Sequence, residues 1–191
     1  MGKRLAEKLN FSYYDDEIVR EAAKYLHSSV EEIESSDEKQ GGILKNAFSN
    51  ANFRYCPEVE IVTDNQAHKA ESNVIMKVAN EKSVVIIGRA ASYLLRNNPR
   101  HVGIFLHADL DFRKKRTREL NNISEDEAMH LIEKTDKQRI KYYKIFTGTD
   151  MYNACRYDLT IDTSILGLEK SEALIMKYLK ERFGDELLRS K

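Results

Sequence analysis

The stretch GIFLHADLDFRKKRTREL, from Gly103 to Leu120, joins an apolar segment to a strongly basic one. With Val102 before it, the first half is a short, nearly continuous apolar run that predicts a buried strand. The second half predicts a helix, on which five basic side chains crowd into six positions: Arg113, Lys114, Lys115, Arg116 and Arg118. A strand that leads directly into a helix is typical of an α/β protein.

Two other segments repeat this arrangement. SVVIIG (83–88) precedes RAASYLLRNN, and YDLTIDT (157–163) precedes a final helix in which Ile175, Leu179 and Phe183 recur every four residues. Short apolar strands that alternate with helices indicate a parallel sheet covered on both faces. We therefore predict a three-layer α/β/α fold with a parallel sheet.

Weaker signals mark the remaining elements. FSYYD (11–15) is a weaker strand between an opening helix over 2–9 and a second helix that begins near Asp16. Ser29 with Glu32, and Ser124 with Glu127, have the spacing of a capping box, and the second pair predicts a long helix from about Glu125 towards Phe146. Residues 40–66 are polar and irregular and are predicted to form a variable insertion.

Length and composition narrow the function. The 191 residues suggest one domain over 1–191, and 31 basic side chains balance 31 acidic ones, so no global cationic field points to nucleic acid. The two cysteines form no CxxC pair, and the five histidines are scattered, so we expect a reducing compartment and no metal site on protein ligands. Without a membrane-length apolar run or a signal peptide, we expect a cytoplasmic protein with no membrane partner.

Polar residues follow the predicted strands where ligands gather in open parallel sheets, at the carboxyl ends. These positions are Gly88-Arg89, His107-Ala108-Asp109 and Asp162-Thr163-Ser164. Glycine lets a ligand approach the backbone, and an adjacent arginine can form two bonds to a phosphate. Loop residues are often polar in any case, so this pattern alone leaves a site and an ordinary surface as equal alternatives.

A second basic segment, EKTDKQRIKYYKIFTGTD, runs from Glu133 to Asp150. On a helix, Asp136, Arg139 and Tyr143 fall along one face. A solvated amphipathic face explains one such helix, but two charge-rich helices downstream of strand ends favour a site for a polyphosphate, whose oxygens accept bidentate bonds from arginine.

The segments IIGRAASYLLR, GIFLHADLDFRKKR, EKTDKQRIKYYKIFTGTD and YDLTIDTSILG, taken in order, resemble the cytidylate kinase-like family of P-loop nucleoside monophosphate kinases. The opening GKRLAEKLNFSYYDDEIVREAA also resembles that family, so the resemblance covers almost the entire chain. It implies a P-loop kinase-like fold, a lid over about 109–150, and an ATP-dependent phosphotransferase that uses Mg²⁺ and a small nucleotide substrate.

The resemblance also implies roles for individual residues. Asp15 would face the acceptor nucleoside, and Arg20 and Arg89 would hold its phosphate. Arg113 and Arg116 would close over ATP, with Asp136 and Arg139 on the far limb of the lid, where Arg139 would stabilise the phosphoryl group in transfer. The residues expected alongside the adenine are Thr163, Ser164 and Gly167.

One part of the family pattern is absent from the sequence. The family begins with a central strand and a glycine-rich loop, but these 191 residues contain no GxxxxGK(S/T) motif, and the strand would lie between 83–88 and 102–108. Three explanations stay open: a shortened sequence, a natural fragment or pseudokinase, and a second copy of the chain that completes the sheet.

The expected function is therefore phosphoryl transfer from ATP to a nucleoside monophosphate or similar small acceptor in the full-length form. One alternative is a non-catalytic nucleotide- or phosphate-binding protein that lacks the P-loop. A second is a module that binds nucleic acid or an acidic partner through the basic helix, against which the neutral net charge argues.

Overall fold

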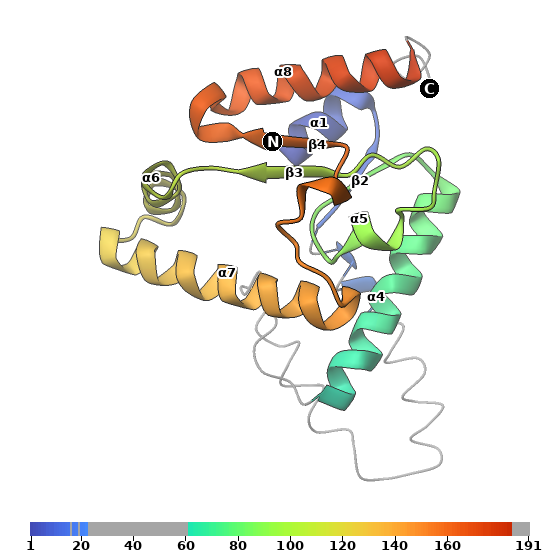
Figure 1. Ribbon diagram of the computed structural model, residues 1–191, viewed down its shortest axis with the longest axis horizontal. Coiled ribbons are helices and arrows are strands. Elements are labelled where there is room, and N and C mark those ends of the chain that lie inside the picture. The colour runs from blue at the N-terminus through green and yellow to red at the C-terminus, as the bar shows by residue number, and fades with distance from the viewer. Residues whose placement is uncertain (16, 19, 23–60, 185–191) are drawn as a thin grey trace. The chain divides into compact units, whose positions relative to one another are not determined.

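The computed structural model describes residues 1–184 apart from 16, 19 and 23–60, and its helices and strands alternate along the chain as the sequence predicts (Figure 1). The chain divides into two compact units, 1–11 with 92–191 and 12–91. The elements are α1 (Gly2–Leu9), β1 (Ser12–Tyr14), α4 (Ile61–Glu81), β2 (Val84–Ile86), α5 (Ala91–Leu94), β3 (Ile104–His107), α6 (Leu110–Asn121), α7 (Glu125–Thr147), η1 (Ala154–Arg156), β4 (Leu159–Asp162) and α8 (Thr163–Phe183).

In the first unit, β3 and β4 pair in parallel, from Ile104 opposite Leu159 to His107 opposite Asp162. Because the strands are parallel, their carboxyl ends meet at one edge, where α6 and α8 begin (Figure 1). The core beside this sheet joins α1, β4 and α8 through five buried side chains: Leu5, Leu9, Ile161, Ile175 and Leu179. The residues predicted to recur every four positions in the last helix thus lie on the face that α8 turns towards the core.

A buried carboxylate also joins α1 to α8. Glu172 on α8 is 2% exposed and accepts bonds from Arg4 Nε at 2.7 Å and from Lys8 Nζ at 2.6 Å. Arg4 and Lys8 lie one turn apart on α1, so both reach the same carboxylate. The two cations lower the pKa of Glu172, Lys8 contributing most and Arg4 next, against the opposing effect of burial.

The helices α6 and α7 meet at a short corner, and Figure 1 shows α6 end-on while α7 is seen along its length. Asp109 caps α6 by accepting a bond from the Phe112 N–H at 2.7 Å. At the start of α7, Ser124 and Glu127 bond each other's backbone N–H groups, which confirms the predicted capping box. Helix α7 ends at Gly148, whose left-handed φ of 68° stops the helix.

In the second unit, β1 and β2 pair in parallel, from Ser12 opposite Val84 to Tyr14 opposite Ile86. Helix α4 supplies buried apolar side chains at positions 70, 74, 75 and 78, which recur at helical spacing. The described residues between 17 and 22 are helical, which agrees with the helix predicted near Asp16.

The four predicted strands are all present, and their pairing is parallel as predicted. They form two sheets, β1–β2 in one unit and β3–β4 in the other. Most of the predicted insertion over 40–66, like the predicted cap Ser29–Glu32, lies outside the described residues. Its last part differs from the prediction, because α4 already begins at Ile61.

Candidate functional site

Arg89, predicted to hold the acceptor phosphate, lies in a strained turn directly after β2. The Ala91 N–H donates to the Gly88 carbonyl at 3.0 Å, which closes a four-residue turn. Its central residues, Arg89 and Ala90, have φ angles of 53° and 52°. Positive φ at both central positions is the geometry of a type I′ turn and costs a non-glycine residue about 1–2 kcal/mol.

The Arg89 side chain turns towards α4, where it meets a buried carboxylate. Arg89 Nη1 lies 3.1 Å from Glu71 Oε1, and the two side chains are 15% and 7% exposed. His68, one turn earlier on α4, has its pKa lowered by burial and next by the charge of Arg89. The imidazole is therefore neutral at pH 7, and Glu71 supplies the negative charge opposite Arg89.

Glu71 is not among the site residues predicted from the sequence, although the sequence carries a signal for it. Glu71 precedes Val74, Ile75 and Val78 by three, four and seven residues, so it occupies the apolar stripe of α4. An ionisable side chain on a buried stripe needs a partner of opposite charge. That pattern predicts a buried ion pair but does not identify the partner.

Asp15 and Arg20, the other residues predicted on the acceptor side, lie in the same unit as Arg89. The Tyr13 hydroxyl donates to Asp15 Oδ2 at 3.0 Å, which orients the carboxylate at the end of β1. Arg20 is 68% exposed and lies 3.9 Å from Glu17 one turn before it. This weak local pair leaves the Arg20 side chain able to bind an anion.

In the other unit, the structure brings two of the predicted lid residues into direct contact. Arg113 Nη2 on α6 donates to both carboxylate oxygens of Asp136 on α7, at 2.7 and 2.8 Å. Both side chains are partly buried, so this contact braces the two helices against each other.

Arg116 and Arg139 lie one turn beyond Arg113 and Asp136 on α6 and α7. Both are exposed, and within the described residues neither forms an ion pair. Of the four arginines on α6 and α7, Arg113 and Arg118 pair with carboxylates, whereas Arg116 and Arg139 are available to an anion. The pairing of Arg113 with Asp136 was not foreseen from the sequence, which assigned both to catalysis.

Thr163 and Ser164 lie at the shared carboxyl edge of β3 and β4, as predicted from the parallel pairing. The Thr163 hydroxyl donates to the His107 carbonyl at 2.9 Å. Ser164 donates its N–H and its hydroxyl to Asp162, and its Oγ accepts the Asp109 N–H at 3.2 Å. The two bonds from Ser164 lower the pKa of Asp162. The bond from the Asp109 N–H links the start of α6 to the start of α8.

Gly167 interrupts α8 shortly after these hydroxyls. Its φ of 73° and ψ of 165° lie outside the helical region, so residues 163–166 form a separate turn before the long helix. Ile165 and Leu166 on this turn are 81% and 37% exposed. Thr163 is buried, so the turn presents its apolar side chains beside the Ser164 hydroxyl, a combination suited to the face and edge of a nucleobase.

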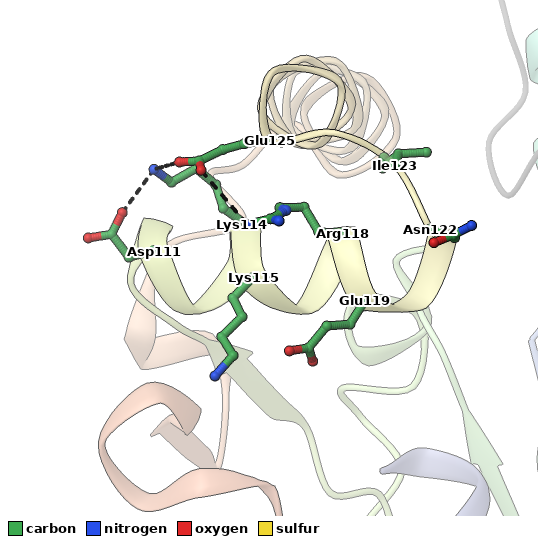
Figure 2. A pocket seen from close by; sticks show the side chains of 8 residues that line it. All are labelled: Asp111, Lys114, Lys115, Arg118, Glu119, Asn122, Ile123 and Glu125. Carbon is green, nitrogen blue, oxygen red and sulfur yellow. Dashed lines mark hydrogen bonds and ion pairs between the residues drawn. The ribbon is translucent and has the colours of Figure 1, made fainter.

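A surface pocket of about 500 Å³ lies at the corner of α6 and α7, apart from Arg113 and Arg116. Figure 2 shows Lys114 between Asp111 and Glu125, while Lys115 and Glu119 extend from the other side of α6. The bonds to Asp111 and then to Glu125 raise the pKa of Lys114. Because Asp111 and Glu125 already pair with Lys114, this pocket is a weaker site for an anion than the exposed Arg116 and Arg139.

Parallel strands followed by helices, with cationic and hydroxyl side chains after the strand ends, define an α/β protein of the P-loop kinase type. A family model described as the cytidylate kinase-like family matches residues 1–165. The chain belongs to the cytidylate kinase-like family, which confirms the resemblance recognised in the sequence.

Individual relatives are more distant. Cytidylate kinase from Methanopyrus kandleri is 27% identical over 173 residues, which cover 86% of this chain and 77% of that protein. Cytidylate kinase from Saccharolobus islandicus is 30% identical over 102 residues, and the match spans about half of each chain, 53%. In fold, the chain is similar to an uncharacterized protein from Eubacterium ventriosum, whose crystal structure aligns with a TM-score of 0.69 at 24% identity, over 94% of this chain and 88% of that one.

Two further observations concern the described residues only. Every helix among them is too short or too polar to cross a membrane. They also contain no group of three histidine, cysteine or acidic side chains arranged to hold a metal ion.

Proposed function

We propose that the protein transfers the γ-phosphoryl group of ATP to a nucleoside monophosphate in the cytoplasm. The observation that carries this proposal is the pair of exposed arginines, Arg116 and Arg139, on two helices braced by the Arg113–Asp136 bond. Phosphoryl transfer needs fixed positive charge around the moving group more than it needs a covalent catalyst. Membership in the cytidylate kinase-like family supports the same reaction.

The lid residues have separate roles in this proposal. Arg139 and Arg116 stabilise the charge on the phosphoryl group and on the phosphates of ATP. Asp136 fixes the guanidinium of Arg113 rather than contacting the substrate, because both of its oxygens accept bonds from Arg113. The turn that contains Thr163, Ser164 and Gly167 receives the adenine against the Ser164 hydroxyl and its exposed apolar side chains, while the buried Thr163 holds the turn to the His107 carbonyl.

The acceptor nucleotide is held by the other unit. Arg89 and Arg20 bind its phosphate, and Asp15, at the end of β1, binds the nucleoside. Mg²⁺ fits this arrangement because it takes most of its ligands from phosphates and water and needs few carboxylates from the protein. When bound with ATP, Mg²⁺ neutralises phosphate charge, whereas the arginines position and stabilise the group that moves.

Replacing Arg139 tests the proposal. We expect Arg139→Ala to lower the rate of phosphoryl transfer from ATP to CMP about 100- to 1,000-fold, as for other groups that stabilise transition-state charge. The affinity for CMP, measured by calorimetry without ATP, should change little. Lys141→Ala, which removes an exposed charge from the same helix, is the control and should retain the wild-type rate.

The outcomes separate the candidate functions. Equal loss of activity in both variants, or wild-type activity in Arg139→Ala, contradicts the role of Arg139. A wild-type protein that binds CMP and ATP but transfers no phosphate supports the alternative, a non-catalytic nucleotide-binding protein. Tight duplex binding that weakens steeply with salt supports a nucleic-acid module instead.

A further inference from the structure

The pairing of Glu71 with Arg89 is difficult to explain by stability alone. The Glu71 side chain is 7% exposed and takes a position on the stripe of α4 that an apolar side chain would fill. Replacing a buried ion pair with apolar residues of similar volume is commonly neutral or stabilising, because the charges no longer lose their hydration.

The backbone conformation at Arg89 is a second, independent indication of a functional role. Gly88, Arg89 and Ala90 have consecutive positive φ angles, although only the first is glycine. Strain of this kind persists where the surrounding structure enforces it, and it concentrates at functional sites. Here the turn places an arginine immediately after a strand and directs its side chain to the buried carboxylate of Glu71.

The contact with Glu71 engages one nitrogen of the Arg89 guanidinium. The 3.1 Å contact joins Arg89 Nη1 to Glu71 Oε1. A guanidinium has five N–H donors in a rigid plane, so a bond through Nη1 is compatible with a bidentate bond from another edge to a phosphate. A side chain fixed in this way loses less conformational entropy when the phosphate arrives.

We infer that Glu71 is a positioning residue, whose buried carboxylate fixes the guanidinium of Arg89 in the orientation that receives the phosphate of the acceptor nucleotide. This inference rests on the proposed function, in which Arg89 binds that phosphate. It adds a residue on α4, 18 positions before Arg89 in the sequence, that acts on the substrate only through Arg89.

The test compares the binding of CMP with that of cytidine, which lacks the phosphate, by calorimetry on the whole chain. We expect Glu71→Ala to weaken CMP binding about tenfold, as happens when a supporting hydrogen-bond partner is removed, and to leave cytidine binding unchanged. Glu71→Gln keeps an oxygen acceptor at the same distance and should restore most of the CMP affinity. In an Arg89→Gln background, Glu71→Ala should weaken CMP binding no further.

Two controls keep the result interpretable. Glu81→Ala removes an exposed carboxylate from the same helix and should leave both affinities unchanged. If Glu71→Ala does not fold, Glu71→Asp carries the test, because it keeps the charge but withdraws the carboxylate by one methylene group. We expect Glu71→Asp to lose about as much CMP affinity as Glu71→Ala.

Each outcome decides one claim. A lower melting temperature with an unchanged ratio of CMP to cytidine affinity overturns the inference and leaves Glu71 a structural residue. Tighter CMP binding in both Glu71→Ala and Glu71→Gln also overturns it, because the carboxylate would then compete with the phosphate. If wild type binds CMP no better than cytidine, or Arg89→Gln keeps the preference for CMP, the proposed role of Arg89 fails and the inference fails with it.

Discussion

The charge cluster around Glu172 gives a prediction about stability that is independent of function. Neutralising both cations in the double variant Arg4→Met, Lys8→Met leaves a carboxylate that is 2% exposed without a partner. We expect a loss of about 3 kcal/mol in the free energy of unfolding, near the low end for a broken buried pair because the cations are half exposed. Glu172→Gln should cost less, about 1 kcal/mol, because Arg4 and Lys8 regain water. Urea denaturation at pH 7 measures both.

The same cluster gives that stability a pH dependence. Because the pKa of Glu172 is lowered from its usual 4.5 in the folded protein, the folded state binds the proton less readily than the unfolded state. The stabilisation is complete above the unfolded pKa and is lost as the pH falls from 4.5 through the folded pKa. The difference in unfolding free energy between wild type and Glu172→Gln should therefore be constant near neutrality and shrink below pH 4.5. A difference that grows on acidification contradicts this account.

Glu71 and Glu172 show what sequence reasoning can and cannot reach for single side chains. Both occupy the apolar stripe of their helix, Glu172 three and seven residues before Ile175 and Leu179. That spacing predicts a buried carboxylate with a cationic partner. The partner itself lies 18 positions away in one case and 168 in the other, and no local pattern identifies it.

The break in α8 at Gly167 gives a prediction at the level of a helix. Its φ of 73° and ψ of 165° belong to a region open almost only to glycine, so we expect Gly167→Ala to lower the free energy of unfolding by about 2 kcal/mol. Gly148 is the matched control: its φ of 68° and ψ of 4° lie nearer the left-handed helical region, and alanine there should cost about 1 kcal/mol. An added Cβ meets no atom within 4 Å at either glycine, so only the backbone differs. Equal losses in thermal unfolding would contradict this explanation.

Elements with strong local signals could be predicted from the sequence, and those that depend on distant contacts could not. The capping box at Ser124 and the apolar runs of β2, β3 and β4 act within a few residues, so the sequence reveals them. The steep crossing of α6 and α7 and the bond between Arg113 and Asp136 depend on a contact across 23 positions. For that reason the family resemblance predicts that both residues belong to the lid, but no local pattern predicts that they neutralise each other.

The candidate residues are divided between the two compact units in a way that follows their proposed roles. Asp15, Arg20 and Arg89 belong to residues 12–91, with β1 and β2. The remaining candidates belong to the other unit, with β3 and β4: Arg113, Arg116, Asp136, Arg139, Thr163, Ser164 and Gly167. From the resemblance alone, the first set is expected to bind the acceptor, and the second to bind ATP and the phosphoryl group in transfer.

This division predicts that the two nucleotides protect different parts of the chain from hydrogen–deuterium exchange. CMP at 100 times its Kd should slow exchange up to about 100-fold at amides of β1, β2 and the turn 88–91, because opening then requires release of the ligand. ATP should instead slow exchange in α6, α7 and the turn 163–166. Cytidine and adenosine are the controls, since without phosphates they should protect the arginine-bearing segments far less. Protection of α6 and α7 by CMP alone would show that the acceptor binds in the other unit and would reverse the assignment.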